Sequence, residues 1–289
     1  MTLSGRKVLV TGGSGGIGSE IARALLARGA HVLITGRSDA ALECTRAMVS
    51  QGPTGDRIDG FAADLSDRTQ IERLAAHARQ WRGGVDILVN NAGTSEFGLL
   101  EETPATAIER VIATNVVAPL LLCRSLLPHL QTKHDAHIVN IGSVFGAIGY
   151  PGFSVYSATK FALRGFSEAL RRELDSTSVH VHHFAPRATR TAFNAGRVDA
   201  LNQELGVATD TPREVAERIC ALLVAGRSEA TLGWPEKLFV KVNALLPGLV
   251  DGSIIKQLPV IRKFARSSAT GHGDAVALGS LPPDSTVTS

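Results

Sequence analysis

Short apolar runs alternate with segments of helical periodicity along most of this chain. The runs are four to six residues long and fall at residues 7–10, 31–35, 57–62, 85–89, 137–142, 179–184 and 229–232. Such runs are typical of strands buried on both faces of a parallel sheet. Between them apolar residues recur every three or four positions, as at Ile21, Ala22, Leu25 and Leu26, which predicts helices. The alternation predicts one domain over residues 1–232, a doubly wound parallel sheet of about seven strands with helices on both faces.

A long helical segment is expected to open at Thr103 and Pro104. Asn115 lies on its apolar face, so its amide needs polar partners there. Asn115 is therefore either a device that kinks the helix or a residue of a functional site. Pro119 and Pro128 are expected to kink or end helical segments.

The chain changes character after residue 232. Residues 233–267 combine apolar positions with Lys and Arg, and we expect two short amphipathic helices interrupted at Pro247 and Pro259. This extension either packs on the body of the protein, contacts a second copy, or lies at a membrane surface. Residues 268–289 are rich in Ser, Thr, Gly, Pro and Ala, which predicts a disordered tail.

The composition indicates a soluble globular protein. Of 289 residues, 44% are hydrophobic and 20% charged, and the formal net charge of +3 is too small to indicate a nucleic-acid partner. We see neither a secretory signal nor an apolar run long enough for a spanning helix, so a cytoplasmic location is expected.

The cysteines and histidines do not predict a metal site. Cys44, Cys123 and Cys220 are far apart, have apolar neighbours and are expected to be small buried residues. His180, His182 and His183 lie close in sequence, but strand alternation puts His182 and His183 on opposite faces. Packing or solvation is the simpler interpretation of these histidines, and no metal is expected.

A glycine-rich turn follows the first strand directly. It reads Thr11-Gly12-Gly13-Ser14-Gly15-Gly16-Ile17-Gly18 and leads into a helix. Glycines allow the backbone to turn tightly and approach a pyrophosphate, while the helix N-terminus offers N–H groups and a positive dipole end. Between a strand and a helix, this turn predicts a dinucleotide-binding site.

The residues at the end of the second strand bear on which dinucleotide binds. An acidic residue there suits a ribose 2′-hydroxyl and an arginine suits a 2′-phosphate. Arg37 and Ser38 occupy the position and favour NADP(H) over NAD(H), unless Arg37 is simply a surface residue. Asp64, after the third strand, either accepts a hydrogen bond from an adenine amino group or belongs to a helix cap.

A phenol and an ammonium are expected to lie side by side on one helix. Tyr156 and Lys160 are four residues apart and so share a helical face. A neighbouring cation lowers the pKa of a phenol, which would let Tyr156 exchange a proton with a substrate oxygen near neutral pH. Ser143, at the end of its strand, could hold the same oxygen. The same spacing also occurs on ordinary solvated helices.

Four motifs together resemble the short-chain dehydrogenase/reductase family across roughly residues 5–232. They are Thr11 through Gly18, Asn90-Asn91-Ala92-Gly93, Asn115, and Ser143 with Tyr156 and Lys160. The resemblance implies a Rossmann-like fold, with Tyr156 as general acid for carbonyl reduction or base for alcohol oxidation. It implies that Lys160 lowers the pKa of Tyr156 and binds the nicotinamide ribose. Ser143 would orient the carbonyl, and Asn115 would hold a water that links Lys160 to solvent.

The resemblance also implies a cofactor site. Gly12, Gly16 and Gly18 would pack on the pyrophosphate, Arg37 and Ser38 would bind the 2′-phosphate, and Asp64 the adenine. Asn91 would lie near the adenosine ribose, and Thr191 would contact the carboxamide or diphosphate. The full expected set is Thr11, Gly12, Ser14, Gly16, Ile17, Gly18, Arg37, Ser38, Asp64, Leu65, Asn91, Ala92, Gly93, Tyr156, Lys160, Pro186, Thr189 and Thr191.

One position departs from the family pattern. Arg187 follows Pro186, where the family usually has glycine. Arg187 either points away harmlessly or enters the substrate mouth and pairs with an acidic group of the substrate. Residues 193–205, further along, are expected to form a mobile helical lid over the substrate.

The expected function is therefore NADP(H)-dependent reduction of a ketone or aldehyde, or oxidation of the corresponding alcohol, on a lipophilic small molecule. An NAD-linked alcohol or hydroxysteroid-type dehydrogenase is the alternative within the same chemistry. A catalytically silent NADP-binding sensor or scaffold is the alternative outside it. The family also implies a homodimer or homotetramer, and residues 234–266 suggest a peripheral membrane contact.

Overall fold

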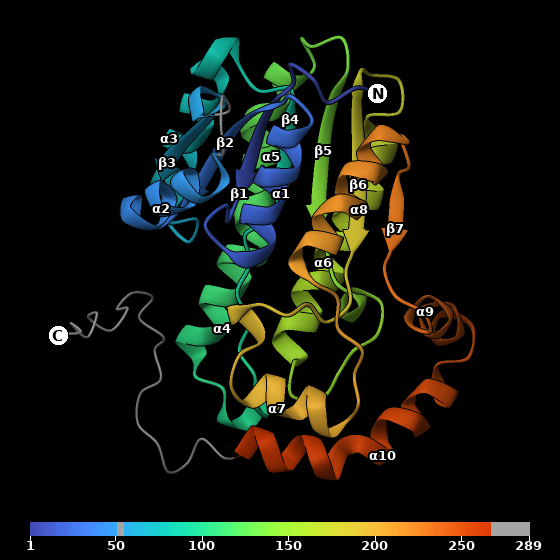
Figure 1. Ribbon diagram of the computed structural model, residues 1–289. Coiled ribbons are helices and arrows are strands. Elements are labelled where there is room, and N and C mark those ends of the chain that lie inside the picture. Colours follow the sequence, from blue (N-terminus) through green and yellow to red (C-terminus); the bar gives the residue numbers. More distant parts are fainter. Residues whose placement is uncertain (51–54, 267–289) are drawn as a thin grey trace, which may run out of the picture.

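The computed structural model describes residues 1–50 and 55–266, and within them seven strands form one parallel sheet (Figure 1). The strand order is β3-β2-β1-β4-β5-β6-β7. The expected doubly wound sheet is thus confirmed. The strands are β1 (Lys7–Thr11), β2 (His31–Gly36), β3 (Ile58–Ala62), β4 (Ile87–Asn90), β5 (Ala136–Ile141), β6 (Val179–Ala185) and β7 (Glu229–Thr231).

Strand alternation sends neighbouring side chains of β1 into two separate cores. Val8 and Val10 pack under α1 (Gly16–Ala27), α2 (Asp39–Val49) and α8 (Pro212–Val224). Leu9 points the other way, toward α3 (Arg68–Gln80), α5 (Ala118–Leu130) and α6 (Ser154–Glu173). Helices therefore cover both faces, which is why the strands are apolar on both sides.

The sheet reverses direction of growth at β1. Strands β2 and β3 extend the sheet on one side of β1, and β4 to β7 extend it on the other. In open α/β sheets a ligand binds at the carboxyl ends of the strands at such a switch point. Short 3-10 turns complete the framework at Gly55–Arg57, Trp81–Gly83, Leu100–Glu102, Val144–Gly146 and Ala192–Asn194.

The long helix around Asn115 is not uniform. It begins as α4 (Ala105–Ile112), widens into the π turn Ala113–Val117 and continues as α5. Pro119 lies in the first turn of α5, and Pro128 lies inside it shortly before its end. By length and mean hydropathy alone, Ala105–Leu130 could cross a membrane. Leu122, Leu126 and Leu130 of this segment pack into the core beside α3, so part of that hydropathy belongs to a core helix.

The C-terminal extension forms two helices, α9 (Glu236–Leu245) and α10 (Pro247–Ala265). Both lie at the end of the molecule toward which the strands point (Figure 1). Pro247 begins α10 as expected, but the expected break at Pro259 is wrong, because the helix continues through it. Pro259 is solvent-exposed, and water can satisfy the carbonyl that it leaves without a partner. The predicted tail, 268–289, lies outside the described residues.

The cysteines are divided between core and surface. Cys123 and Cys220 are buried and their pKa values are raised to about 12 and about 11 by burial. The expectation that Cys44 is buried is wrong, because its position on α2 faces solvent.

Candidate active site

Ser143, Tyr156 and Lys160 converge at the carboxyl end of β5. Ser143 comes just after the strand, and the other two project from the first turns of α6. The Lys160 Nζ donates to the Ile141 carbonyl oxygen at 2.9 Å and lies 5.5 Å from the centre of the Tyr156 ring. The Ser143 hydroxyl is near enough to the Tyr156 phenol to lower the pKa of that phenol. The fold therefore joins a hydroxyl, a phenol and an ammonium that are separated by up to 17 positions in sequence.

Burial governs the protonation of this group. It raises the pKa of Tyr156 to about 12, while the nearby Ser143 hydroxyl acts in the opposite direction. It lowers the pKa of Lys160 to about 8. The expected net lowering of the Tyr156 pKa is not seen, because burial is the larger influence on the phenol and the Lys160 ammonium is directed to the Ile141 carbonyl. At neutral pH the phenol is protonated, which is the form that can donate a proton.

Asn115 lies where the helix widens, and its amide finds the polar partners that its buried position requires. It forms the π turn, and its amide is fully used: Oδ1 accepts from the Thr94 N–H at 2.8 Å, while Nδ2 donates to the Thr94 carbonyl at 2.8 Å and to Thr159 Oγ1 at 3.1 Å. A Cβ on Gly93 would lie 3.4 Å from Asn115 Oδ1 and 3.8 Å from Lys160 Nζ. The loop after β4 thus reaches Lys160.

Thr94 and Thr159 escaped the sequence analysis. Each is a single small polar residue beside a recognised motif, and their pairing depends on two helices and a loop that meet only in the fold. No local pattern marks such residues.

The glycine-rich turn is locked to the end of β4. Thr11 Oγ1 accepts from the backbone N–H groups of Asn91 and Ala92 at 3.0 and 2.9 Å. Asn91 Nδ2 donates to the Thr11 carbonyl at 2.9 Å, so this amide supports the turn. Gly12 has φ +65°, and a Cβ there would lie 2.9 Å from the Ala92 Cα. Only glycine fits without displacing the backbone.

The N-terminus of α1 is open at this turn. Gly15 precedes it and has no side chain that could cap it. A Cβ on Gly16 would come within 2.8 Å of Thr191 Cγ2, so the segment after β6 lies over the helix start. A Cβ on Gly18 would be 2.1 Å from the Gly12 carbonyl oxygen. We call the turn and the start of α1, Gly12 to Gly18, the glycine cradle; it has no room for side chains at Gly12, Gly16 and Gly18. Ile17 packs toward the core beneath it.

The expected nucleotide-specificity residues lie beside the turn. Ser14 Oγ is 2.7 Å from the position that a Cβ on Gly36 would take, which places the turn against the end of β2. Arg37 follows and is exposed, and Ser38 caps α2 by accepting from the Ala41 N–H at 3.3 Å. Arg37 and Ser38 therefore follow the end of β2, against which the glycine turn packs through Ser14.

Four further residues expected to bind the cofactor, Asp64, Leu65, Pro186 and Thr189, have other surroundings in the fold. Asp64 accepts from the Ser66 N–H and Oγ at 2.9 and 2.8 Å, while the cap of α3 is Asp67. Leu65 is buried in the core, so its side chain cannot meet a nucleotide. Pro186 and Thr189 are also buried.

Arg187 does not reach the substrate mouth as a free cation. Its guanidinium pairs with Asp210 at 2.7 Å and with Glu236 at 3.6 Å. The hydrogen bond to Asp210 raises the pKa of Arg187 further. Arg187 therefore ties the segment after α7 (Arg197–Glu204) to the start of α9.

Apolar side chains surround Tyr156. The cluster is lined largely by rings, and α10 contributes to it from the far end of the chain. The Phe145 and Phe193 ring centres lie 6.4 and 5.9 Å from that of Tyr156. The cluster includes Phe97, Phe145, Tyr150, Phe153, Tyr156, Leu201, Ile261, Phe264 and Ala265.

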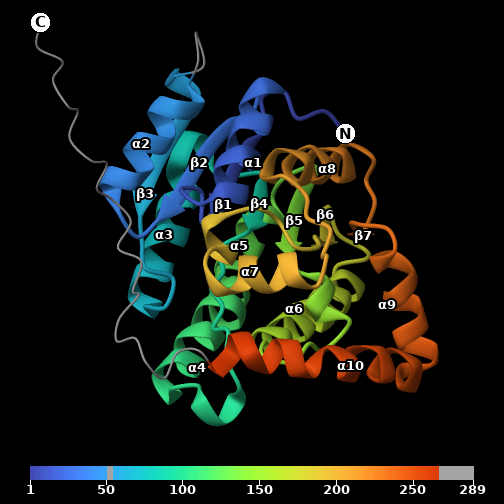
Figure 2. The ribbon, with the colours of Figure 1, turned by 60° about the horizontal axis from the view of Figure 1, so that its bottom comes forward.

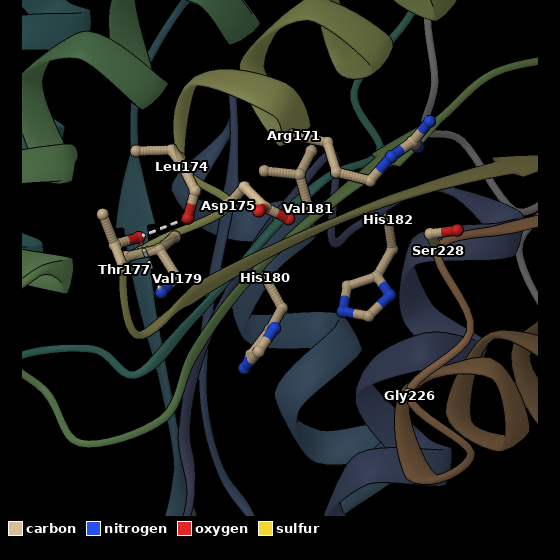
Figure 3. Close-up of a pocket in the computed structure, with 10 residues that line it drawn as sticks. All are labelled: Arg171, Leu174, Asp175, Thr177, Val179, His180, Val181, His182, Gly226 and Ser228. Atoms are coloured by element: carbon tan, nitrogen blue, oxygen red, sulfur yellow. Dashed lines mark hydrogen bonds between the residues drawn. The ribbon is translucent and has the colours of Figure 1, made fainter.

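Two histidines of β6, His180 and His182, lie away from this site, whereas His183 packs against Gly142, next to Ser143. Figure 3 shows His180 and His182 in a hollow where β6 begins. This is the end of the strands opposite to the one that Ser143 follows. His182 Nε2 is 2.9 Å from His137 Nδ1, and its Nδ1 is 2.7 Å from the Arg227 carbonyl oxygen. Within residues 1–50 and 55–266 no group of three His, Cys, Asp or Glu side chains is placed to hold a metal ion.

The doubly wound sheet, the glycine cradle and the group around Tyr156 define a nicotinamide-nucleotide-dependent oxidoreductase. A family model described as short chain dehydrogenase matches residues 6–202. The chain belongs to the short chain dehydrogenase family, whose members bind NAD(P).

Known proteins resemble the chain over most of its length. It is 33% identical over 257 residues to dehydrogenase/reductase SDR family member 7B from Bos taurus, covering 84% of this chain and 78% of that protein. It is 33% identical over 231 residues to the 3-oxoacyl-[acyl-carrier-protein] reductase FabG of Vibrio cholerae, covering 77% and 91%. A short-chain dehydrogenase from Sphingobium yanoikuyae, solved with NADPH, superposes with a TM-score of 0.72 at 25% identity, covering 85% and 95%.

Proposed function

We propose that this protein is an NADP(H)-dependent reductase of a ketone or aldehyde carried on a lipophilic small molecule. The observation that carries the proposal is the convergence of Ser143, a protonated Tyr156 and Lys160 at the carboxyl end of β5. A module that only binds a nucleotide has no need of a phenol poised beside a buried ammonium.

The glycine cradle fits a dinucleotide. Three positions leave no room for a Cβ, and the open start of α1 offers backbone N–H groups to a diphosphate. The cationic side chain of Arg37, exposed at the end of β2, would hold the 2′-phosphate of NADP(H), with Ser14 and Ser38 beside it. The solved neighbours include one complex with NADPH and one with NAD, so the proposed preference rests on Arg37.

The residues around Tyr156 would manage the proton of the reaction. When bound, the nicotinamide supplies the hydride. Tyr156 would donate its phenolic proton to the carbonyl oxygen, and Ser143 would orient that oxygen by a hydrogen bond. The Lys160 ammonium would stabilise the phenolate that forms. Asn115, next to Gly93 and Lys160, would support the path by which the proton is replaced.

The surroundings of the phenol favour an apolar substrate. The aromatic and aliphatic cluster around Tyr156 offers few polar partners to a ligand. Arg187, the candidate for binding an acidic substrate group, is occupied by two carboxylates.

We also propose a homodimer or homotetramer that associates through the helices bearing Asn115 and Tyr156. Ile112 and Val117 expose 42% and 43% of their surface there, and Phe161 on α6 exposes 44%. Three large apolar residues on neighbouring helices are suited to an interface.

Tyr156→Phe tests the assignment. The variant keeps the ring but cannot donate a proton, so ketone reduction should fall by on the order of 10³-fold or more, while NADPH binding stays within about twofold. Both are measured on a panel of long-chain and ring ketones, by absorbance and by calorimetry. Tyr150→Phe is the matched control, because it removes the other phenol of the same cluster and keeps the ring, so turnover should change by less than about tenfold. Full turnover by Tyr156→Phe would remove Tyr156 from the mechanism.

A further inference from the structure

The two C-terminal helices have a face fixed to the protein. On α9, Val240 packs on the body and Asn243 Nδ2 donates to the Ala147 carbonyl at 2.9 Å. On α10, Gln257 bonds to the Tyr150 hydroxyl at 2.7 Å, and Ile261 is completely buried. These positions recur at helical spacing, so α9 and α10 have a defined inner and outer side.

The outer side exposes large apolar residues where the two helices meet. Leu245, Leu246 and Leu249 expose 79%, 57% and 66% of their surface. We call these three residues the elbow. Trp234, at 73%, and Ile255, at 62%, extend the apolar surface on either side. A soluble protein rarely leaves so many large apolar side chains together in water.

Positive charge flanks the elbow. Residues 234–266 contain six basic and two acidic residues, a net charge of +4, whereas the whole chain has +3. One of the two acids, Glu236, is already paired with Arg187. The exposed basic residues are Lys237, Lys241, Lys256, Arg262, Lys263 and Arg266.

This charge pattern argues against a second copy of the chain as the occupant. In a two-fold dimer the same patch meets itself, so these basic residues would face one another with little acidic surface to offset them. An apolar tip within a basic surround instead complements the acyl chains and headgroups of an anionic bilayer. We propose that the elbow inserts into an anionic lipid surface, with the flanking basic residues on the headgroups.

This docking would place the active site next to the lipid. The inner side of α10 contributes Ile261 and Phe264 to the cluster around Tyr156. Figure 2 shows α10 running from α9 to α4 alongside α6 and α7. The docked helix therefore lies between the bilayer and the reacting groups, and we infer that the substrate is drawn from the membrane. Only this second inference rests on the proposed function; the docking does not.

Vesicle sedimentation with the full chain tests the docking. The probes are vesicles of phosphatidylcholine alone and of phosphatidylcholine with about 30% phosphatidylserine. The intact protein should sediment with the anionic vesicles, and the triple variant Leu245→Ser/Leu246→Ser/Leu249→Ser should partition at least about tenfold more weakly. Lys256→Glu/Arg262→Glu should lose about as much on anionic vesicles, because each basic residue contributes separately.

Matched controls change exposed residues elsewhere. Met48→Ser/Leu100→Ser/Val224→Ser removes three exposed apolar side chains, and Arg73→Glu/Arg213→Glu reverses two exposed charges. Both should sediment like the intact protein.

Three results would overturn the docking. In the first, the intact protein does not sediment with anionic vesicles. In the second, the elbow variant sediments as well as the intact protein. In the third, the intact protein does not bind vesicles and the elbow variant has a lower oligomer mass in light scattering, which would make the elbow a contact between copies of the chain. Tyr156→Phe should bind vesicles normally, and the elbow variant should reduce a water-soluble ketone at the normal rate. Failure of the docking and failure of the reductase assignment are therefore separable.

Discussion

Lys160 is held in a position where burial opposes its charge. Its side chain is 5% exposed, and burial lowers its pKa to about 8. The protonated form is the one that stabilises a phenolate at Tyr156. As pH rises through about 8 the ammonium loses its proton, so carbonyl reduction should decline over that interval.

The pH dependence of kcat/KM, from about pH 6 to about pH 10 with saturating NADPH, measures this decline. Lys160→Arg remains charged throughout, so whatever activity it retains should lack the decline near pH 8. A wild-type rate that is flat across pH 8, or an arginine variant that declines in the same way, would contradict the role given to Lys160.

At the residue scale the sequence predicted which side chains come together but not their pKa values. The spacing of Tyr156 and Lys160 predicted two neighbouring side chains, and they are neighbours. The pKa of Tyr156 moved opposite to expectation because burial and the direction of the Lys160 side chain are set by the surrounding fold. The hydrogen-bond partners of Asn115 could not be predicted either, because they too are brought together only by the fold.

Arg187 links elements that are far apart in sequence. It bridges Asp210, after α7, and Glu236, at the start of α9, with all three side chains at most 20% exposed. Removing the arginine leaves two poorly solvated carboxylates close together. Arg187→Ala should therefore lower the free energy of unfolding by on the order of 1–3 kcal/mol and make the extension easier to cleave.

Urea unfolding and limited proteolysis measure these effects. Arg68→Ala is the control, because its pair with Glu72 is 74% and 57% exposed and should contribute less than about 1 kcal/mol. Equal losses of unfolding free energy and equal cleavage rates in the two variants would show that Arg187 does not hold the extension to the body.

At the scale of elements, apolar runs predicted all seven strands within about two residues of their ends. Strands buried on both faces leave a strong local signal. At Asn115 the sequence allowed a kink as one alternative but did not indicate a π turn, and the passage of α10 through Pro259 left no local signal. Both depend on where polar backbone groups find partners in the complete structure.

For the whole molecule, the sequence predicted the doubly wound sheet because alternating strands and helices allow few other arrangements. It left open where the extension lies. The structure shows α10 against the cluster around Tyr156, a contact between segments about 100 residues apart. The extension packs on the body, which was one of the alternatives, and it also exposes apolar residues on its outer side.

Calorimetric titration with NADPH and with NADH tests the central claim most directly. Exposed Arg37 at the end of β2 should make NADPH the tighter ligand by at least about tenfold, as expected for a charged hydrogen bond to a phosphate. Arg37→Asp should reverse or abolish that preference while leaving NADH binding intact. Equal binding of both nucleotides, or an unchanged preference in Arg37→Asp, would contradict the assignment to NADP(H).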